Sequence, residues 1–215
     1  MGFFDSFPPP EPPTPPRRPR RPAWRSPGRN VKPVALAVDD ILVRREELAV
    51  YVNDFSVYPN GFTLTITTLR RQQAGAGGWD GHPGHHPNPF GPRRNRGGGA
   101  SAEELEGIFR FGVRFADGRS GAFEGLGAWR GEVVEPPAAP FVSMHAGHGN
   151  ESEWVQGLWV WGIPEEGDVE LIYSWLAESV PESRVVVDGD VLRDAAARAV
   201  TLWDEPDYAE DGDGA

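Results

Sequence analysis

Three closely spaced histidines are the first residues in this sequence whose type and spacing could support chemistry. His82, His85 and His86 occur in the segment GHPGHHPNP, and imidazole is a ligand for zinc, nickel and copper. The neighbouring glycine and proline residues allow many backbone geometries and favour none of them. We therefore expect a solvated flexible loop, and we keep a metal- or small-ligand-binding protein, using the loops around 80–86 and 145–153, as the alternative.

Catalytic nucleophiles have less support. Ser120 lies in GRSG, which lacks the G-x-S-x-G motif and the strand-to-helix turn that exposes a nucleophilic serine. The single lysine, Lys32, does not stand in a phosphate-binding loop. The chain has no cysteine, which excludes a thiol nucleophile, a disulfide framework and a cysteine-ligated zinc site. We therefore predict a protein that is not an enzyme and uses no cofactor, with a hydrolase as the weakest alternative.

Tryptophan and arginine side chains are the candidates for partner binding. In LWVWG, Trp159 and Trp161 share one face of a strand, and the aliphatic residues beside them share the other. A strand that is apolar on both faces is typical of a central strand under an additional cover, or of an exposed aromatic patch that binds a partner. Arg110 and Arg114 alternate with apolar residues and are expected on the exposed side of their strand. We predict these four residues as the binding set.

The distribution of charge limits the class of partner. The 215 residues contain 21 basic and 32 acidic side chains, a net charge of −11, and all the basic side chains but one are arginine. Residues 1–31 carry six arginines against two acidic residues, whereas residues 204–215 carry six acidic residues and no basic one. Duplex nucleic acid needs a basic protein face, so we expect a protein partner and no duplex nucleic acid. The acidic composition also favours a cytoplasmic protein.

The N-terminal segment, residues 1–31, is predicted to be a disordered tail. Its PPPEPPTPPRRPRRP stretch cannot form helix or sheet, because proline lacks the amide hydrogen and fixes φ. Phe3, Phe4 and Phe7 precede this stretch and could insert weakly at a membrane surface while the arginines contact anionic headgroups. The stretch could also dock as a proline-rich peptide, and a solubilising tail is the simplest interpretation.

Alternating apolar residues predict a mainly β domain, an antiparallel β-sandwich, over residues 32–204. Several short runs place apolar side chains at every second position and are bounded by turn-forming residues, as expected for strands with one buried face. The chain shows no alternation of strands with helices, which disfavours a doubly wound nucleotide-binding fold. The strands are expected at residues 34–38, 48–52, 55–58, 62–67, 109–115, 119–123, 141–145, 154–161, 169–175 and 184–187.

The pattern is clearest in a hairpin predicted over residues 55–69. Phe62 and Leu64 alternate with threonines, which is typical of a half-buried strand. Asn60-Gly61 precedes this strand, and both residues adopt positive φ at low cost, as a tight turn requires. We therefore expect the turn to depend on the conformational freedom of this pair.

The end of the domain is predicted to be helical and to lead into an acidic disordered tail over residues 205–215. Asp188 is suited to cap a helix, and DVLRDAAARAVTLW follows with apolar residues at helical spacing as far as Trp203. Earlier in the chain, residues 72–100 are rich in glycine, proline, histidine and arginine and show no periodicity. We expect this stretch to be a long flexible insertion loop.

Three stretches resemble a group of actinobacterial β-rich proteins to which no activity is assigned. They are AVDDILVRREELAVYVNDFSVYPNGFTLTI, FGVRFADGRSG and LWVWGIPEEGDVELIYSWLAESVPESRVVVDGDVLRDAAARAVTLW. The resemblance covers most of residues 32–204 and leaves the N-terminal tail and the insertion outside. It implies a high-GC bacterial source and supports the domain boundaries, and it implies no catalytic residue. The sequence as a whole therefore predicts a cytoplasmic, non-enzymatic interaction module that binds a macromolecular partner.

Overall fold

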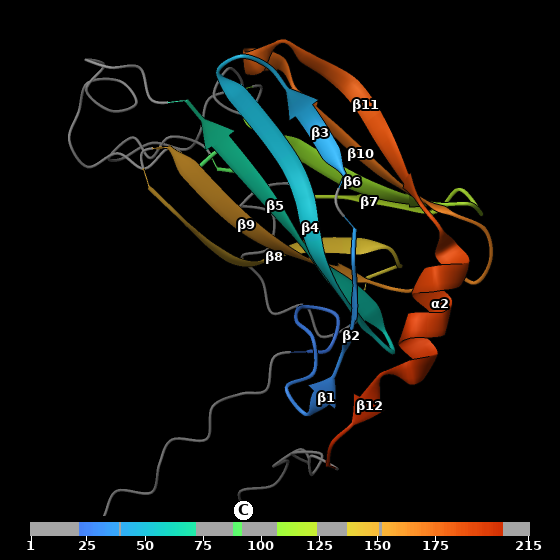
Figure 1. Ribbon diagram of the computed structural model, residues 1–215. Coiled ribbons are helices and arrows are strands. Elements are labelled where there is room, and N and C mark those ends of the chain that lie inside the picture. The colour runs from blue at the N-terminus through green and yellow to red at the C-terminus, as the bar shows by residue number, and fades with distance from the viewer. Residues whose placement is uncertain are drawn as a thin grey trace, which may run out of the picture.

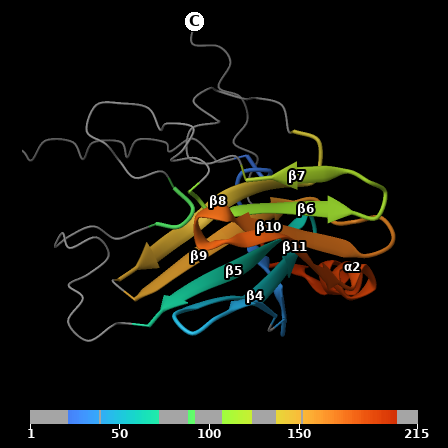
Figure 2. The same ribbon diagram turned by 90° about the horizontal axis from the view of Figure 1, so that it is seen from above.

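The computed structural model describes residues 22–38, 40–71, 88–91, 107–123, 137–150 and 152–203. Within these residues the chain forms antiparallel sheets and one short helix near the C-terminal end (Figure 1). The predicted mainly β fold with a single C-terminal helix is therefore confirmed. Two sheets lie face to face as the layers of a sandwich, and a view from above shows the strands of both layers (Figure 2).

The larger sheet has six strands. Two short strands, β2 (Val34–Leu36) and β3 (Ile41–Arg44), follow one another along the same partner strand, with β2 opposite residues 55–57 and β3 opposite residues 49–51. The sequence analysis missed β3, because its apolar run is only three residues long. In spatial order the sheet contains β2 (Val34–Leu36), β4 (Leu48–Tyr58), β5 (Gly61–Arg70), β9 (Glu153–Trp161) and β8 (Phe141–Gly149), and β3 (Ile41–Arg44) also pairs with β4.

The smaller sheet has four strands, and a separate pair of short strands joins the two ends of the described chain. In the pair, β1 (Val31–Lys32) runs antiparallel to β12 (Val200–Thr201). A single 3₁₀ turn, η3 (Leu176–Glu178), connects two strands of the smaller sheet. In spatial order that sheet contains β11 (Val180–Val187), β10 (Val169–Trp175), β6 (Arg110–Phe115) and β7 (Ser120–Ala122).

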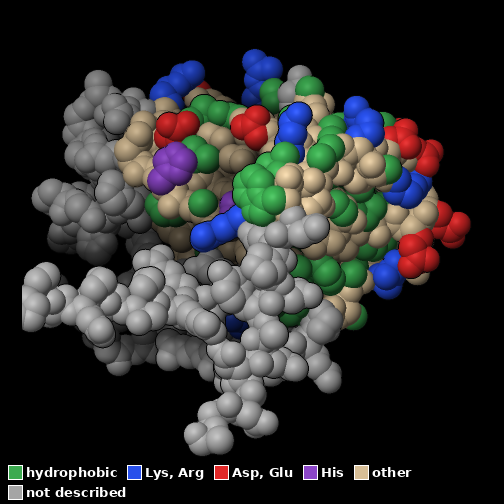
Figure 3. Space-filling model, turned by 90° about the horizontal axis from the view of Figure 1, so that it is seen from below, with side chains coloured by type: hydrophobic (Ala, Val, Ile, Leu, Met, Phe, Trp, Pro, Cys, Tyr) green, Lys and Arg blue, Asp and Glu red, His purple; other side chains and the backbone are tan. Residues whose placement is uncertain are grey.

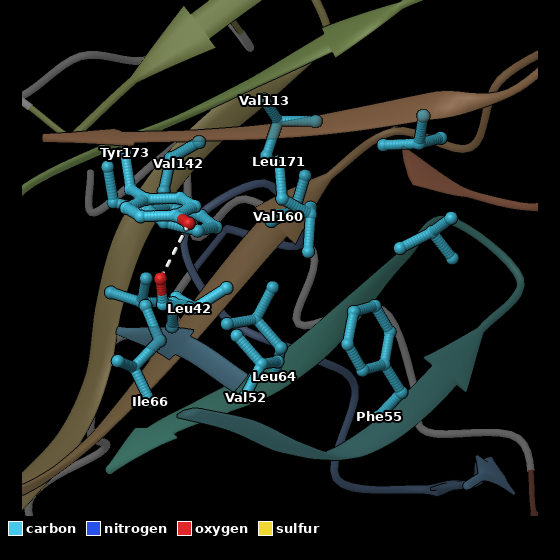
Figure 4. Close-up of a cluster of buried hydrophobic side chains, with 14 of the residues drawn as sticks. Leu42, Val52, Phe55, Leu64, Ile66, Val113, Val142, Val160, Leu171 and Tyr173 are labelled. Carbon is cyan, nitrogen blue, oxygen red and sulfur yellow. Dashed lines mark hydrogen bonds between the residues drawn. The ribbon is translucent and has the colours of Figure 1, made fainter. Parts of the chain in front are cut away.

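The core lies between the two sheets and is built from the alternating apolar residues of both. Val52, Leu64 and Val160 project from the larger sheet towards Val113 and Leu171 of the smaller one (Figure 4), and all five are at most 1% exposed. Removing this apolar surface from water is the main force that holds the layers together.

A tyrosine hydroxyl at the edge of this core forms a hydrogen bond between the two layers. The buried Tyr173 hydroxyl donates a hydrogen bond of 2.8 Å to the carbonyl oxygen of Leu42, which ties the smaller sheet to β3 (Figure 4). A buried hydroxyl without a partner would cost about 1–3 kcal/mol. Because of this hydrogen bond, the Tyr173 hydroxyl can be buried at the edge of the sandwich without that cost.

The predicted hairpin is confirmed as β4–β5, but the glycine in its turn has a different role. Tyr58 pairs with Gly61, so Gly61 is already part of the strand, and it does not have a positive φ. A Cβ atom on Gly61 would lie 2.2 Å from the backbone oxygen of Val160 and 2.7 Å from the ring of Trp159, both on the neighbouring strand. Glycine is therefore required here because the backbone of that strand and the ring of Trp159, 98 positions later in the sequence, leave no room for a side chain.

The helix α2 (Gly189–Arg198) begins where predicted and ends earlier. The carboxylate of Asp188 accepts hydrogen bonds from the backbone N–H groups of Asp190 and Val191, which is the expected N-cap. The chain leaves the helix after Arg198 to form β12, so Trp203 is not on a helical face and is 58% exposed. Pairing with β1 satisfies the backbone there in place of a further helical turn.

One residue of the predicted insertion loop, Phe90, belongs to the core. Residues 88–91 form a turn in which the Asn88 carboxamide accepts a hydrogen bond from the N–H of Phe90. The Phe90 ring is fully buried, with its centroid 5.1 Å from that of Phe109. The rest of the 72–100 stretch lies outside the described residues. A single aromatic residue in a glycine- and proline-rich stretch gives no periodic signal, which explains why the sequence analysis missed this anchor.

Candidate functional site

The four predicted binding residues do not form one site. Trp159 and Trp161 lie on β9, on the outer face of the six-stranded sheet, whereas Arg110 and Arg114 lie on β6, on the outer face of the four-stranded sheet. The inner faces of the two sheets pack against each other in the core. The tryptophans and the arginines are consequently on opposite sides of the sandwich, and each pair must be considered alone.

Trp159 is fully buried, although it faces away from the core. A stretch of chain that we call the cover segment, residues 22–30, lies over it. The Trp159 indole N–H donates a hydrogen bond of 3.1 Å to the carbonyl oxygen of Trp24, and the Tyr58 ring packs edge-on against Trp159 with centroids 5.5 Å apart. Of the two predicted alternatives, the structure has the central strand beneath an additional cover, so Trp159 is not an exposed platform.

The cover segment is itself held by specific contacts. Trp24 is 3% exposed and its ring meets Phe141 edge-on at 5.4 Å. The Ser143 hydroxyl donates to the carbonyl oxygen of Arg25. The predicted disordered tail, residues 1–31, therefore overlaps the fold by about ten residues; residues 1–21, including Phe3, Phe4 and Phe7, lie outside the described part. Proline-rich composition concealed the single tryptophan that docks this segment.

Trp161 lies two residues further along β9, at the edge of the covered region. It is half-buried, and it pairs in register with Gly61 on one side and Phe141 on the other. It lies on the same outer face of the sheet as Trp159, and part of its side chain is exposed to water. Of the two predicted tryptophans, Trp161 is therefore the one with surface that a partner could contact.

The arginines lie on an open surface. Arg110, Arg114 and Arg184 project from the outer face of the four-stranded sheet, and we call this surface the arginine face. Glu170 on β10 forms ion pairs with both Arg114 and Arg184. The Arg114 Nε atom is 2.6 Å from the nearer carboxylate oxygen, and the Arg184 guanidinium is 3.3 Å from the other oxygen. The carboxylate therefore holds two of the three guanidinium groups in place.

Arg184 is the member of this face that sequence reasoning missed. It was predicted to lie in the last short strand, but nothing local relates it to Arg114, 70 positions earlier. The register makes the connection, because Ile172 on β10 pairs with Arg184 on one side and with Gly112 on the other. Only the order of the strands β11, β10 and β6 reveals the set.

The turn beside this face carries a further charged pair. Arg119 donates to the carboxylate of Asp117 through its side chain, with Nε 2.7 Å from the oxygen, and through its backbone N–H. These hydrogen bonds hold the pKa of Asp117 below its ordinary value. The weak hydrolase candidate, Ser120, follows in β7 as an exposed residue paired with Arg114. The Asp117–Arg119 pair and Ser120 therefore both belong to the β6–β7 hairpin and lie on its exposed surface.

The histidines are placed only in part. His145 and His148 are exposed on β8, and Figure 3 shows histidine side chains at the surface. His82, His85 and His86 lie outside the described residues, so the alternative of a metal site remains a prediction. In the described ranges, no group of three or more histidine, aspartate and glutamate side chains is arranged to hold a metal ion.

The hairpin after His148 has a structural explanation for its polar residues. The Asn150 side-chain oxygen accepts hydrogen bonds from the backbone N–H groups of Ser152 and Glu153, which closes the turn between β8 and β9.

In the described part of the chain, a helix with the length and apolar character needed to span a membrane is absent. No family model, curated protein or solved structure matches this chain.

Proposed function

We propose that this protein is a non-enzymatic β-sandwich interaction module that binds an acidic segment of a protein partner through the arginine face. The observation that carries the proposal is the presentation of Arg110, Arg114 and Arg184 on one exposed sheet surface. The predicted binding roles of Arg110 and Arg114 are retained, and Arg184 is added. The predicted role of Trp159 is not, because the cover segment buries its ring.

The shape of the arginine face suits a partner in an extended conformation. Small residues lie along β6 and β7, with Gly112 between Arg110 and Arg114 and opposite Ala122, and Ser120 opposite Arg114. These residues leave the sheet low beside the arginines of β6, whereas Ile172 and Glu170 on β10 lie between β6 and Arg184. A partner backbone could therefore approach closely while its side chains reach the guanidinium groups.

The charge of the surface selects the partner. The chain as a whole has a net charge of −11, so its long-range field repels other acidic proteins. The arginine face carries three guanidinium groups, and the carboxylate of Glu170 pairs with two of them, which leaves local positive charge on an acidic molecule. Arginine binds carboxylates through two parallel hydrogen bonds, so the surface favours glutamate and aspartate side chains over basic or neutral ones.

A display experiment with random peptides tests the proposal. We expect the full chain to enrich peptides containing several acidic residues, and we expect the Arg110→Ser/Arg184→Ser double variant to lose at least tenfold in affinity for them. The matched control is Arg44→Ser, because Arg44 is also exposed but lies on β3 in the other sheet. Equal retention of the peptides by the double variant and the native chain would contradict the proposal.

A further inference from the structure

The strand β11 has a free edge along the arginine face. Among the described residues β11 pairs with β10 alone, and it is the last strand of its sheet. Pro181 stands near its beginning, where it removes one backbone donor. Residues 183–187 follow without proline, so about 17 Å of strand edge offers backbone N–H and C=O groups.

An apolar groove borders this edge. It has a volume of about 290 Å³ and lies between the end of β2 and the junction of β11 with α2. Val186 and Val191 are 54% and 44% exposed at its margin, and Val186 pairs with Glu170, which places it on the same outer face of β11 as Arg184. The residues lining it are Leu36, Ala37, Val38, Asp40, Val186, Val187, Asp188 and Val191.

We propose that the partner adds a strand to the free edge of β11, and that this strand alternates apolar and acidic residues. The inference rests on the proposed function and specifies how the arginine face is used. Backbone hydrogen bonds to residues 183–187 would extend the four-stranded sheet by one strand, which is a common mode of peptide recognition. Side chains of the added strand alternate between its two faces, so one set enters the groove and the other continues the arginine face.

The charges on the two sides of β11 determine the order of residues in the partner. On the outer face, Arg184 is 63% exposed and would lie beside the added strand, where an opposite-charge cross-strand pair stabilises the sheet. On the groove side, Asp40 and Asp188 stand among aliphatic residues and disfavour a partner carboxylate. A partner carboxylate is therefore accepted on the outer face beside Arg184, and apolar residues are accepted on the groove side and beside Val186.

The test uses a short acetylated peptide in which valine and glutamate alternate, added to the full chain labelled with ¹⁵N. We expect chemical-shift changes at residues 183–187 and at Val191, with weaker changes on β8. A peptide of the same composition with its valines and glutamates in separate blocks should bind at least tenfold more weakly. Val191→Lys should reduce binding of the alternating peptide. The control Val200→Lys should not, because Val200 is also an exposed valine but lies on β12.

Backbone methylation separates this inference from the proposed function. Two versions of the alternating peptide carry N-methyl groups on one or the other alternate set of backbone nitrogens. Strand addition requires that only one version loses binding, by at least tenfold, because only one set of N–H groups faces β11. If both versions bind like the parent peptide while Arg110→Ser/Arg184→Ser weakens binding, strand addition is wrong and the proposed binding role of the arginine face is supported. If the double variant binds the parent peptide normally, the proposed function fails as well.

Discussion

The two outer faces of the sandwich differ in how they meet water. On the six-stranded sheet, Trp159 and its neighbours form an apolar surface, and the cover segment shields it. On the four-stranded sheet, the arginine face lies open and carries the Arg114–Glu170–Arg184 ion pairs. Both faces belong to antiparallel sheets of the same domain, so the difference comes from the side chains and not from the backbone.

This difference shows which of the two faces contributes to the stability of the fold. A large aromatic ring such as Trp159 stabilises the fold only when water is excluded, and its indole N–H must then find an acceptor. The Trp24 carbonyl oxygen supplies that acceptor. Charged residues on the other face keep their hydration and contribute little to folding. The covered face therefore contributes to stability, and the open face is the one for which we propose a binding role.

Replacing Trp159 should produce the largest effect on stability. Trp159→Ala removes a fully buried ring and leaves a cavity beneath the cover segment, so we expect a loss of about 3–5 kcal/mol in the free energy of unfolding. Urea denaturation followed by circular dichroism measures this change. Trp203→Ala is the matched control, because Trp203 is 58% exposed and should cost at most about 0.5 kcal/mol. Similar losses in both variants would refute the assignment of a buried role to Trp159.

Replacing Trp24 should have the second largest effect, about 2 kcal/mol. The loss is smaller than for Trp159 because the cover segment can detach without opening the core between the sheets. Detachment would expose the ring of Trp159, so Trp24→Ala should also increase binding of an apolar dye to the folded protein. Unchanged stability and unchanged dye binding would show that residues 22–30 are not part of the fold.

Replacing Arg114 should change stability by less than about 1 kcal/mol, because its ion pair with Glu170 is partly exposed to solvent. Arg114→Ala is compared with the native chain at low and high salt. Screening should reduce the small difference further. A loss comparable with that of Trp24→Ala would mean that the arginine face is structural, which would weaken its proposed role in binding.

The smallest expected effect is a dependence of stability on alkaline pH. Burial raises the pKa of Tyr58, which lies against Trp159 on the covered face. Because the folded-state pKa exceeds the unfolded value of about 10, this contribution is complete below pH 10 and is lost as the pH rises through the folded-state pKa. Tyr58→Phe should therefore flatten the loss of stability above pH 10 in urea denaturation, while Arg114→Ala should not. An identical alkaline profile in Tyr58→Phe and the native chain would be the contrary result.

The alternation of apolar residues predicted most strands because side chains on a strand repeat with a period of two. The same rule placed Arg110 and Arg114 on an exposed face, where the structure has them. It also recognised LWVWG as apolar on both faces, but it could not choose between a cover and an exposed patch. That choice depends on Trp24, which is 135 positions away in the sequence.

Other features had no periodic signal to detect. Phe90 is a single aromatic residue among glycines and prolines, and its burial depends on Phe109 and the space at the end of the core. The early end of α2 at Arg198 also escaped prediction, because DVLRDAAARAVTLW keeps helical spacing to its end. Pairing of Val200 and Thr201 with β1 competed with helix formation there.

The amino-acid sequence by itself determined the class of the fold: strands with one buried face, a capped helix near the end, and an acidic body without cysteine chemistry. Tertiary structure decided which surfaces meet water. Periodicity is a local property that assigns side chains to a face, whereas pairing between strands joins residues far apart in the chain. For that reason the burial of Trp159 and the grouping of Arg184 with Arg114 emerged only when the strands were assembled.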